Sequence, residues 1–298
     1  WLGDCVMATP AIENIVNFDN DTQITLIGSF VSIEALKNHP EVVKTVVLSK
    51  KYRDLVKISK ELGDFDIFFS FRSSIRSKFL KFFISAENKY QFDKNTYQNR
   101  HQVEKYNDFV NDSLSINLTA KKLQIYGYST SKNKKKILGI NPGASYGSAK
   151  RWYPEEFAKV AGELSSQYDI VIFGGPGEKD IAMDIEKSLL EKGIDNYQNL
   201  AANTTIPELI DHISKLDLFI TGDSGPMHVA AAFQVPTVAI FGPTKDDETS
   251  QWMNDKSIIV KKNLGCQPCM KRTCPLQHHE CMKLITAVEV LDAVKGLD

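Results

Sequence analysis

The chain has 298 residues with 36 Lys or Arg and 37 Asp or Glu, so its formal net charge is −1 and its pI is near 6.7. This balance excludes the electrostatic signature of a dedicated nucleic-acid-binding protein, whose pI usually exceeds about 9. The hydrophobic fraction is 42% and no apolar run approaches the roughly 18 residues of a spanning helix, so a globular chain of about two domains is expected.

Short β-branched or aromatic runs recur along the chain, and most of them lack apolar–polar alternation. Such runs are typical of strands that are covered on both faces. The expected strands are residues 24–27, 45–48, 66–70, 137–141, 169–174, 217–221 and 236–242. Helical patterns lie between several of them, and strands that alternate with helices predict the parallel, doubly wound sheets of an α/β protein.

Two helices have clear start signals. In the segment 154–167, Pro154 is followed by two glutamates, which fits a helix start and its dipole. Thr205 and Glu208 have the spacing of a capping box that opens a helix reaching residue 216.

A lysine-rich break divides the chain. Residues 131–136 contain four lysines and separate one set of α/β units from a second set. A charge run is ordinarily a solvated loop, and here it is also placed to be a linker. We therefore expect an N-terminal domain of residues 1–130, a linker at 131–136 and a C-terminal domain of residues 137–298, whose final helix packs back on the N-terminal domain.

The first chemical candidate lies at the front of the chain. Gly3 and Asp4 look like the loop that follows a strand, although none precedes them, so the first strand is expected to be missing from the sequence. Gly3 allows a tight loop and close approach of the backbone to a ligand. Asp4 would then be either a general base that faces the cleft or a helix N-cap.

Two glycine-containing loops follow strands in the second half. The segment 141–152 reads NPGASYGSAKRW, in which backbone N–H groups and the Ser145 hydroxyl can surround a phosphate while Lys150 supplies charge. It is neither a Walker A loop nor a dinucleotide fingerprint, and a plain surface loop is the alternative. In the segment 173–178, Glu178 either complements a helix dipole or accepts hydrogen bonds from a ribose or a base.

The segment 221–232, TGDSGPMHVAAA, is the most informative one. Asp223 or Ser224 can cap the helix that follows, whose exposed N-terminus is an anion site by geometry and dipole. His228 lies one turn into this helix and either points at the same ligand or is structural. Thr244 follows the next strand, on the rim where open α/β sheets bind ligands.

Five short motifs occur in a fixed order. They are Gly-Asp-x-Val-x-Ala-Thr-Pro, Pro-Gly-Ala with Lys-Arg-Trp, Gly-Gly-Pro-Gly-Glu, Gly-Asp-Ser-Gly-x-x-His and Phe-Gly-Pro-Thr. Together they resemble glycosyltransferase family 9, the bacterial lipopolysaccharide heptosyltransferases. The Trp-Leu-Gly-Asp opening and the tail Cys-x-Pro-Cys-x-x-Arg-x-Cys-Pro-x-x-His-His-x-Cys-Met resemble the heptosyltransferase II branch of that family.

The resemblance implies a GT-B fold, in which two Rossmann-like, doubly wound α/β domains face each other across a cleft. It implies an inverting transfer of heptose from ADP-L-glycero-D-manno-heptose to the heptosyl-Kdo2-lipid A inner core of lipopolysaccharide, without a metal or other cofactor. Asp4 matches the family's general base, and Lys150 matches the cation that stabilises the leaving diphosphate. The donor site implied by the match comprises Gly3, Gly143, Ser145, Tyr146, Glu178, Asp223, Ser224, Gly225, His228 and Thr244.

The N-terminal domain is then expected to bind the anionic acceptor. Arg72 and Arg76 follow a strand, and Arg100 lies further on. Guanidinium groups are well shaped for the carboxylates of Kdo and the phosphates of lipid A, and a solvated basic helix face is the alternative. The expected protein is a cytoplasmic monomer without a signal-peptide pattern, in peripheral contact with the inner face of the inner membrane and with no nucleic-acid partner.

The cysteines are unevenly placed. Cys5 stands alone, whereas Cys266, Cys269, Cys274 and Cys281 fall within sixteen residues. Four thiolates at these spacings could form a structural zinc site, although the pattern lacks two paired Cys-x2-Cys knuckles. Bound metal, reduced thiols and disulfides therefore stay open. So do two other functions: a GT-B transferase with another donor or acceptor, and a zinc-stabilised binding protein without activity.

Overall fold

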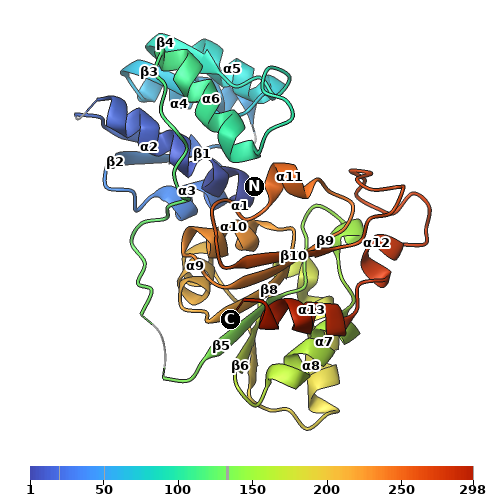
Figure 1. Cartoon of the computed structure of the whole chain (residues 1–298). Helices are drawn as coiled ribbons and strands as arrows, with labels where there is room; N and C mark the ends of the chain where they lie inside the picture. The colour runs from blue at the N-terminus through green and yellow to red at the C-terminus, as the bar shows by residue number, and fades with distance from the viewer. Residues whose placement is uncertain (20, 50, 132–133, 298) are drawn as a thin grey trace.

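The computed structural model describes residues 1–19, 21–49, 51–131 and 134–297. Positions 132 and 133 of the expected linker lie outside the described residues. We call the described residues up to 131 the N-terminal half and those from 134 onward the C-terminal half. In Figure 1 the N-terminal half forms the upper lobe and the C-terminal half the lower lobe. Among the described residues, no helix is both long and apolar enough to cross a membrane.

One parallel sheet organises the C-terminal half. Its strands are β5 (Ile137–Asn141), β6 (Asp169–Ile172), β7 (Tyr197–Asn199), β8 (Leu218–Gly222), β9 (Thr237–Phe241) and β10 (Ser257–Lys261). They lie in the order β10-β9-β8-β5-β6-β7. This is the doubly wound order, and its topological switch point falls between the adjacent strands β5 and β8.

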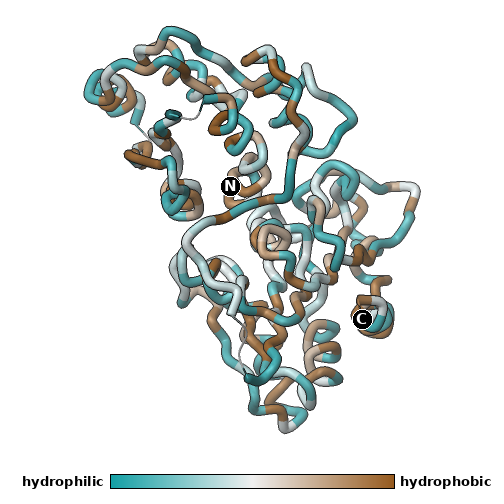
Figure 2. Tube along the Cα trace, turned by 60° about the vertical axis from the view of Figure 1, so that its left-hand side comes forward, coloured by the Kyte–Doolittle hydropathy of each residue, from teal (hydrophilic) through white to brown (hydrophobic). Residues whose placement is uncertain are grey.

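Helices cover both faces of this sheet. The helical elements are η1 (Ser148–Lys150), α7 (Pro154–Leu164), η2 (Pro176–Glu178), α8 (Lys179–Leu190), α9 (Ile206–Ser214), α10 (Gly225–Ala232), α11 (Asp246–Thr249), α12 (Glu280–Lys283) and α13 (Ala287–Lys295). Helices α7, α8 and α13 contribute to the buried cluster on one face, and α9 and α10 to the cluster on the other. Figure 2 shows hydrophobic stretches along the middle of this half, where the sheet lies.

Local signals set several of these helices. The Thr205 hydroxyl accepts from the Glu208 N–H, and the Glu208 carboxylate accepts from the Thr205 N–H, so the predicted capping box is confirmed. Pro154 stands at the start of α7 as expected. The final helix, α13, packs against α7, β9 and β10. This differs from the expectation that it returns to the N-terminal domain, because its apolar face joins the core of the six-stranded sheet.

The N-terminal half is built from two strand pairs and six helices among its described residues. Its elements are α1 (Leu2–Met7), α2 (Thr9–Phe18), β1 (Ile24–Gly28), α3 (Phe30–Leu36), β2 (Val42–Val47), α4 (Tyr52–Glu61), β3 (Asp64–Ser70), α5 (Ile75–Phe83), β4 (Ser85–Gln91) and α6 (Gln102–Leu114). The pairs β1–β2 and β3–β4 are both parallel. The mixed α/β fold with parallel sheets is therefore confirmed.

The front of the chain is helical. Gly3 and Asp4 lie inside α1, so the expectation that they form a loop is wrong. The N-cap is Trp1, without a side-chain capping bond, which also removes the alternative role of Asp4 as an N-cap.

Helix α1 docks directly on α10 at the junction of the two lobes (Figure 1). A Cβ atom added to Gly3 would lie 2.8 Å from Cδ2 of His228, and one added to Gly225 would lie 2.9 Å from Cβ of Leu2. Both distances are shorter than real Cβ contacts, so the two helices approach this closely only because each carries a glycine. Buried residues of both helices belong to one hydrophobic cluster that spans the two halves.

A second contact joins α6 to the chain around α11. Lys105 Nζ lies 2.5 Å from Oε2 of Glu248, and the Lys105 side chain is almost fully buried. The His101 Nε2 atom lies 3.0 Å from the Ser250 carbonyl oxygen, and the His101 ring packs on Trp252. Polar and aromatic contacts around α11 therefore add to the α1–α10 packing that joins the two lobes.

The close approach of α1 and α10 predicts a stability effect at Gly3. We expect Gly3→Ala to lower the free energy of unfolding by about 1–3 kcal/mol, because the added methyl group collides with a buried ring. The matched control is Gly177→Ala, whose added methyl group has nothing within 4 Å. Urea unfolding of both variants checks this, and equal midpoints would contradict the packing argument.

Candidate active site

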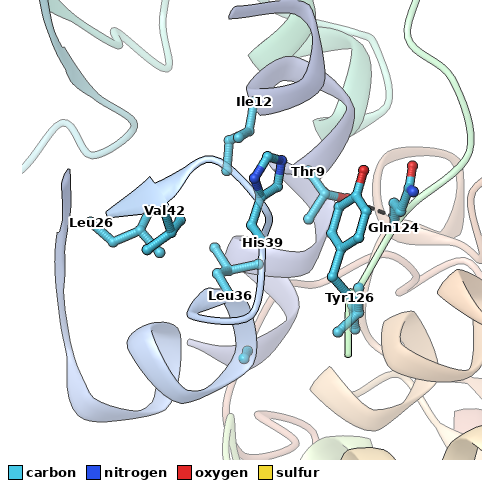
Figure 3. Close-up of a pocket in the computed structure, with 10 residues that line it drawn as sticks. Thr9, Ile12, Leu26, Leu36, His39, Val42, Gln124 and Tyr126 are labelled. Carbon is cyan, nitrogen blue, oxygen red and sulfur yellow. Dashed lines mark hydrogen bonds between the residues drawn. The ribbon is translucent and has the colours of Figure 1, made fainter. Parts of the chain in front are cut away.

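Two cavities differ greatly in volume and in their place in the fold. One cavity in the N-terminal half, lined by Thr9, His39 and Tyr126 among others, has a volume of about 10 Å³ (Figure 3). That is room for about one water molecule, so it holds no substrate. Another cavity, of about 640 Å³, lies beyond the ends of β9 and β10, and Thr244 is part of its lining. The larger opening is thus on the rim where the carboxyl ends of the strands meet.

The switch point between β5 and β8 is cross-linked by polar side chains. Asn141 ends β5, and its Nδ2 lies 3.3 Å from Oγ1 of Thr221 and 3.2 Å from Oγ of Ser224. The same Nδ2 atom lies 3.3 Å from the Gly143 carbonyl oxygen. These bonds hold the loops after β5 and β8 side by side, which is where doubly wound sheets bind ligands.

A buried ion pair lies between these two loops. Lys150 Nζ lies 2.5 Å from Oδ2 of Asp223, and both side chains are largely buried. The Thr244 hydroxyl donates to the same carboxylate oxygen at 2.6 Å. Lys150 and Thr244, which come from two other predicted motifs, therefore both bind the Asp223 carboxylate. This holds the ammonium group of Lys150 at the carboxyl edge of the sheet.

Helix α10 begins beside this ion pair. Ser224 is its N-cap residue but makes no side-chain capping bond, because its hydroxyl is used by Thr221 and Asn141. The first turn thus lacks a side-chain acceptor. Pro226 has no N–H and the Met227 N–H donates to the Ser224 carbonyl oxygen, so this helix N-terminus favours an anion mainly through its dipole.

His228 is buried in the first turn of α10. Burial lowers the pKa of its imidazole to about 4, and the positive charge of Lys150 acts in the same direction. The ring is therefore neutral at pH 7, and its Nδ1 atom is buried without a hydrogen-bond partner in the described structure. Because this nitrogen has almost no exposed surface, the ring is a packing group of the α1–α10 contact beside the anion site.

Glu178 lies over the start of the β5–α7 loop. A Cβ atom on Gly143 would fall 2.1 Å from the Glu178 carboxyl carbon, so only glycine leaves room for this carboxylate. Oε2 of Glu178 also accepts from the Gly175 N–H at 2.7 Å. Gly143 follows β5 and Glu178 follows β6. Because these two strands are neighbours in the sheet, the two residues come together at its carboxyl edge.

Asp4 reaches this region because α1 packs on α10. Its side chain is about one-third exposed, and Oδ2 accepts from Nη1 of Arg72 at 3.2 Å. Tyr106 lies near the same carboxylate: burial, and then the negative charge of Asp4, raise the pKa of its hydroxyl, which stays neutral. A predicted base and a predicted acceptor cation are therefore in direct contact.

The other two predicted acceptor cations have partners elsewhere. Arg76 donates to the Ser49 carbonyl oxygen and lies over the Tyr52 ring. Arg100, just before α6, pairs with Asp108 on that helix. These contacts of Arg76 and Arg100 do not involve the Asp4–Arg72 pair. Sequence spacing alone does not show which of the three arginines lies beside Asp4.

A C-terminal stretch packs on the β5–α7 loop. We call residues 262–282 the tail segment. The Ala149 N–H donates to the Arg272 carbonyl oxygen at 3.0 Å, and Nε2 of His279 lies 3.0 Å from the Ala149 carbonyl oxygen. A Cβ atom on Gly147 would fall 2.2 Å from the Arg272 carbonyl oxygen, so glycine is required for this contact.

Tyr146 is the side-chain link between the two segments. Its hydroxyl donates to the Met270 carbonyl oxygen at 2.7 Å. Lys150 Nζ lies 4.8 Å from the centre of its ring, and the Arg272 guanidinium carbon lies 5.4 Å from the same centre. Ser145, by contrast, is exposed in the loop. Sequence reasoning assigned no role to Arg272, although its place inside the cysteine motif was a visible signal.

All five cysteines are free thiols in this structure. Burial raises the pKa of Cys281 to about 11, with smaller contributions from Cys266, Cys269 and Cys274, so Cys281 is a neutral thiol at pH 7. Among the described residues, no three His, Cys, Asp or Glu side chains are arranged to hold a metal ion.

Comparison with known proteins connects this geometry to one family. The model of glycosyltransferase family 9 (heptosyltransferase) matches residues 56–280. A lipooligosaccharide heptosyltransferase 2 from Campylobacter jejuni is 45% identical over 306 residues, covering the whole chain and 95% of the relative.

Solved structures agree in fold. A family 9 glycosyltransferase from Veillonella parvula superposes with a TM-score of 0.83 at 20% identity, covering 100% of this chain and 94% of that one. The ADP-heptose LPS heptosyltransferase II of E. coli superposes with a TM-score of 0.82 at 20% identity, covering 100% and 96%.

The buried, neutral His228 makes stability depend on pH. Its imidazole has a pKa near 6.5 in the unfolded chain and about 4 in the folded protein. Between these values the unfolded state binds more protons, so the stability that His228 contributes is present above pH 6.5 and is lost as the pH falls. We expect His228→Gln to remove up to about 3 kcal/mol of this pH dependence.

Urea unfolding at pH values at either end of this window measures the difference. His278→Gln, at a partly exposed histidine of the tail segment, is the control and should keep the wild-type pH dependence. An unchanged pH dependence in His228→Gln would contradict a buried neutral imidazole.

Proposed function

The chain belongs to glycosyltransferase family 9, and on that premise we propose that it transfers heptose from ADP-L-glycero-D-manno-heptose to the heptosyl-Kdo2-lipid A inner core of lipopolysaccharide. One observation carries the proposal. A cation and an N-terminal helix turn without a side-chain cap lie at the switch point of the sheet, and helix α1, which carries Asp4 from the other half, packs on that turn. This is the set of groups that an inverting transfer from a nucleoside diphosphate sugar requires.

The two halves take different substrates in this proposal. The donor binds to the C-terminal part, residues 137–298, with its adenosine toward Glu178 and its diphosphate between Lys150 and the start of α10. Support comes from the order of these groups along the strand ends β6, β5 and β8. The acceptor binds to the N-terminal part, residues 1–130, where Arg72 is available beside Asp4.

The reaction is a single displacement. A hydroxyl oxygen of the acceptor attacks the anomeric carbon of heptose, and the bond from that carbon to the diphosphate oxygen breaks. Asp4 takes the proton of the attacking hydroxyl. Lys150 and the positive end of the α10 dipole stabilise the negative charge that develops on the departing ADP, as fixed positive groups do without reorganisation. Arg72 orients the Asp4 carboxylate through their hydrogen bond.

We also propose that the protein works in the cytoplasm in peripheral contact with the inner membrane. Helix α5 supports this, because Ile75 and Phe82 are strongly exposed and Lys78 and Lys81 lie on the same short helix. Phe82 therefore lies outside the core. Exposed apolar side chains with neighbouring lysines favour an anionic lipid surface.

A donor panel tests the activity. Purified protein is incubated with heptosyl-Kdo2-lipid A and, separately, ADP-heptose, ADP-glucose or UDP-glucose, and both ADP or UDP release and product mass are measured. Release only from ADP-heptose, with a product heavier by one heptose, is expected. Transfer from another donor alone would favour a GT-B transferase of different specificity.

Asp4→Asn tests the general base. The amide keeps the size of the side chain but cannot accept the proton, so we expect the transfer rate to fall by about 100-fold or more. The unfolding midpoint should stay near that of the wild type. Asp21→Asn, at an exposed aspartate away from the site, is the control. Wild-type turnover in Asp4→Asn would exclude this residue as the base.

Lys150→Ala tests stabilisation of the leaving group. Loss of one positioned charge should lower kcat by about 100-fold or more, while the affinity for the acceptor is retained. Because Asp223 keeps its bond from Thr244, the loop should stay folded, which unfolding checks. Lys187→Ala, at an exposed lysine on α8, is the control. Equal kinetics in both variants would exclude a diphosphate role for Lys150.

A further inference from the structure

Arg272 is a cation to which the mechanism assigns no role. Its side chain is exposed, and its guanidinium carbon lies 5.4 Å from the centre of the Tyr146 ring. Within the described part of the chain, no carboxylate lies within salt-bridge distance of it. Arg72, on the N-terminal side of the site, differs in this respect because it pairs with Asp4.

The backbone of Arg272 is fixed against the β5–α7 loop. Its carbonyl oxygen accepts from the Ala149 N–H at 3.0 Å, and the missing side chain of Gly147 makes room for that approach. Two residues earlier, the Met270 carbonyl oxygen accepts from the Tyr146 hydroxyl. Because the backbone at Met270 and Arg272 is already held, little backbone entropy is lost when the Arg272 side chain binds a ligand.

Arg272 and Lys150 share one aromatic ring but not one counterion. The ammonium group of Lys150 has the buried carboxylate of Asp223 at 2.5 Å. Arg272 has only the ring face, a weak partner for an exposed cation. Among the described residues, the Arg272 charge beside the Tyr146 ring therefore has no carboxylate partner, next to the loop at the switch point.

Resting on the proposed function, we propose that Arg272 binds a phosphate oxygen of the donor's diphosphate as a second cation beside Lys150. The planar guanidinium group offers several N–H donors in a fixed fork that fits phosphate oxygens. Tyr146 orients this fork by stacking, and the tail segment positions it by its backbone bonds. Arg272 thereby binds both the intact donor and the ADP that leaves.

Ligand binding tests this assignment without depending on turnover. ADP and adenosine are titrated calorimetrically into the full chain and into Arg272→Ala, Arg272→Lys and Lys271→Ala. We expect Arg272→Ala to weaken ADP binding about tenfold, the loss of one charge-assisted contact. Adenosine lacks phosphates, so its affinity for Arg272→Ala should equal its affinity for the wild-type protein. Arg272→Lys should lie between the two, because it keeps the charge but not the fork.

Lys271→Ala is the matched control, since Lys271 is the adjacent exposed cation of the same segment, and it should bind ADP as wild type does. Unchanged ADP affinity in Arg272→Ala, or an equal loss in Lys271→Ala, would overturn the assignment while leaving the donor proposal intact. Wild-type protein that binds no ADP would overturn the proposed donor and the role of Arg272 together.

Discussion

The close packing of α1 on α10 is the constraint on which the rest of the site depends. Gly3 and Gly225 remove the two side chains that would separate these helices. A carboxylate from the front of the chain thereby reaches a helix start that follows it by more than two hundred residues. The hydrophobic cluster around the contact contains residues of both halves, so burial of apolar surface holds the arrangement together. Placement of Asp4 beside the donor loops is thus a packing result.

Charge at the switch point is organised around Asp223. A buried carboxylate is costly unless it is paired and hydrogen-bonded, and here Lys150 and Thr244 satisfy it. The same pair fixes an ammonium group at the strand ends before any ligand arrives, which is the preorganisation that electrostatic catalysis uses. His228 is neutral beside it, because burial and nearby positive charge oppose protonation. Anion binding here therefore relies on Lys150 and on the helix N-terminus.

The tail segment, which contains the cysteine motif, lies against the loops at the carboxyl edge of the sheet. It packs on the β5–α7 loop through Arg272, Met270 and His279, and Gln267 donates to the Gly242 carbonyl oxygen at the end of β9. The segment thus joins the loops after two strands and forms one wall of the site. One thiol supports that wall from within, because Cys281 is buried next to the position of Gly242.

Much of the C-terminal half follows from local sequence. Apolar runs gave β5, β6, β8 and β9, the Thr205–Glu208 spacing gave the start of α9, and glycine-rich stretches marked the loops at the strand ends, because short-range patterns encode local backbone geometry. Strands β4 and β7 were missed, since polar or short strands take their pairing from neighbours that the pattern does not contain. Strand β10 was missed although its centre is apolar. The helical state of Gly3 and Asp4, the course of α13, the separate partners of Arg72, Arg76 and Arg100, and the approach of Arg272 to Tyr146 were decided by tertiary structure. Each depends on contacts between segments far apart in the chain, and such contacts are set by packing volume and charge pairing in three dimensions.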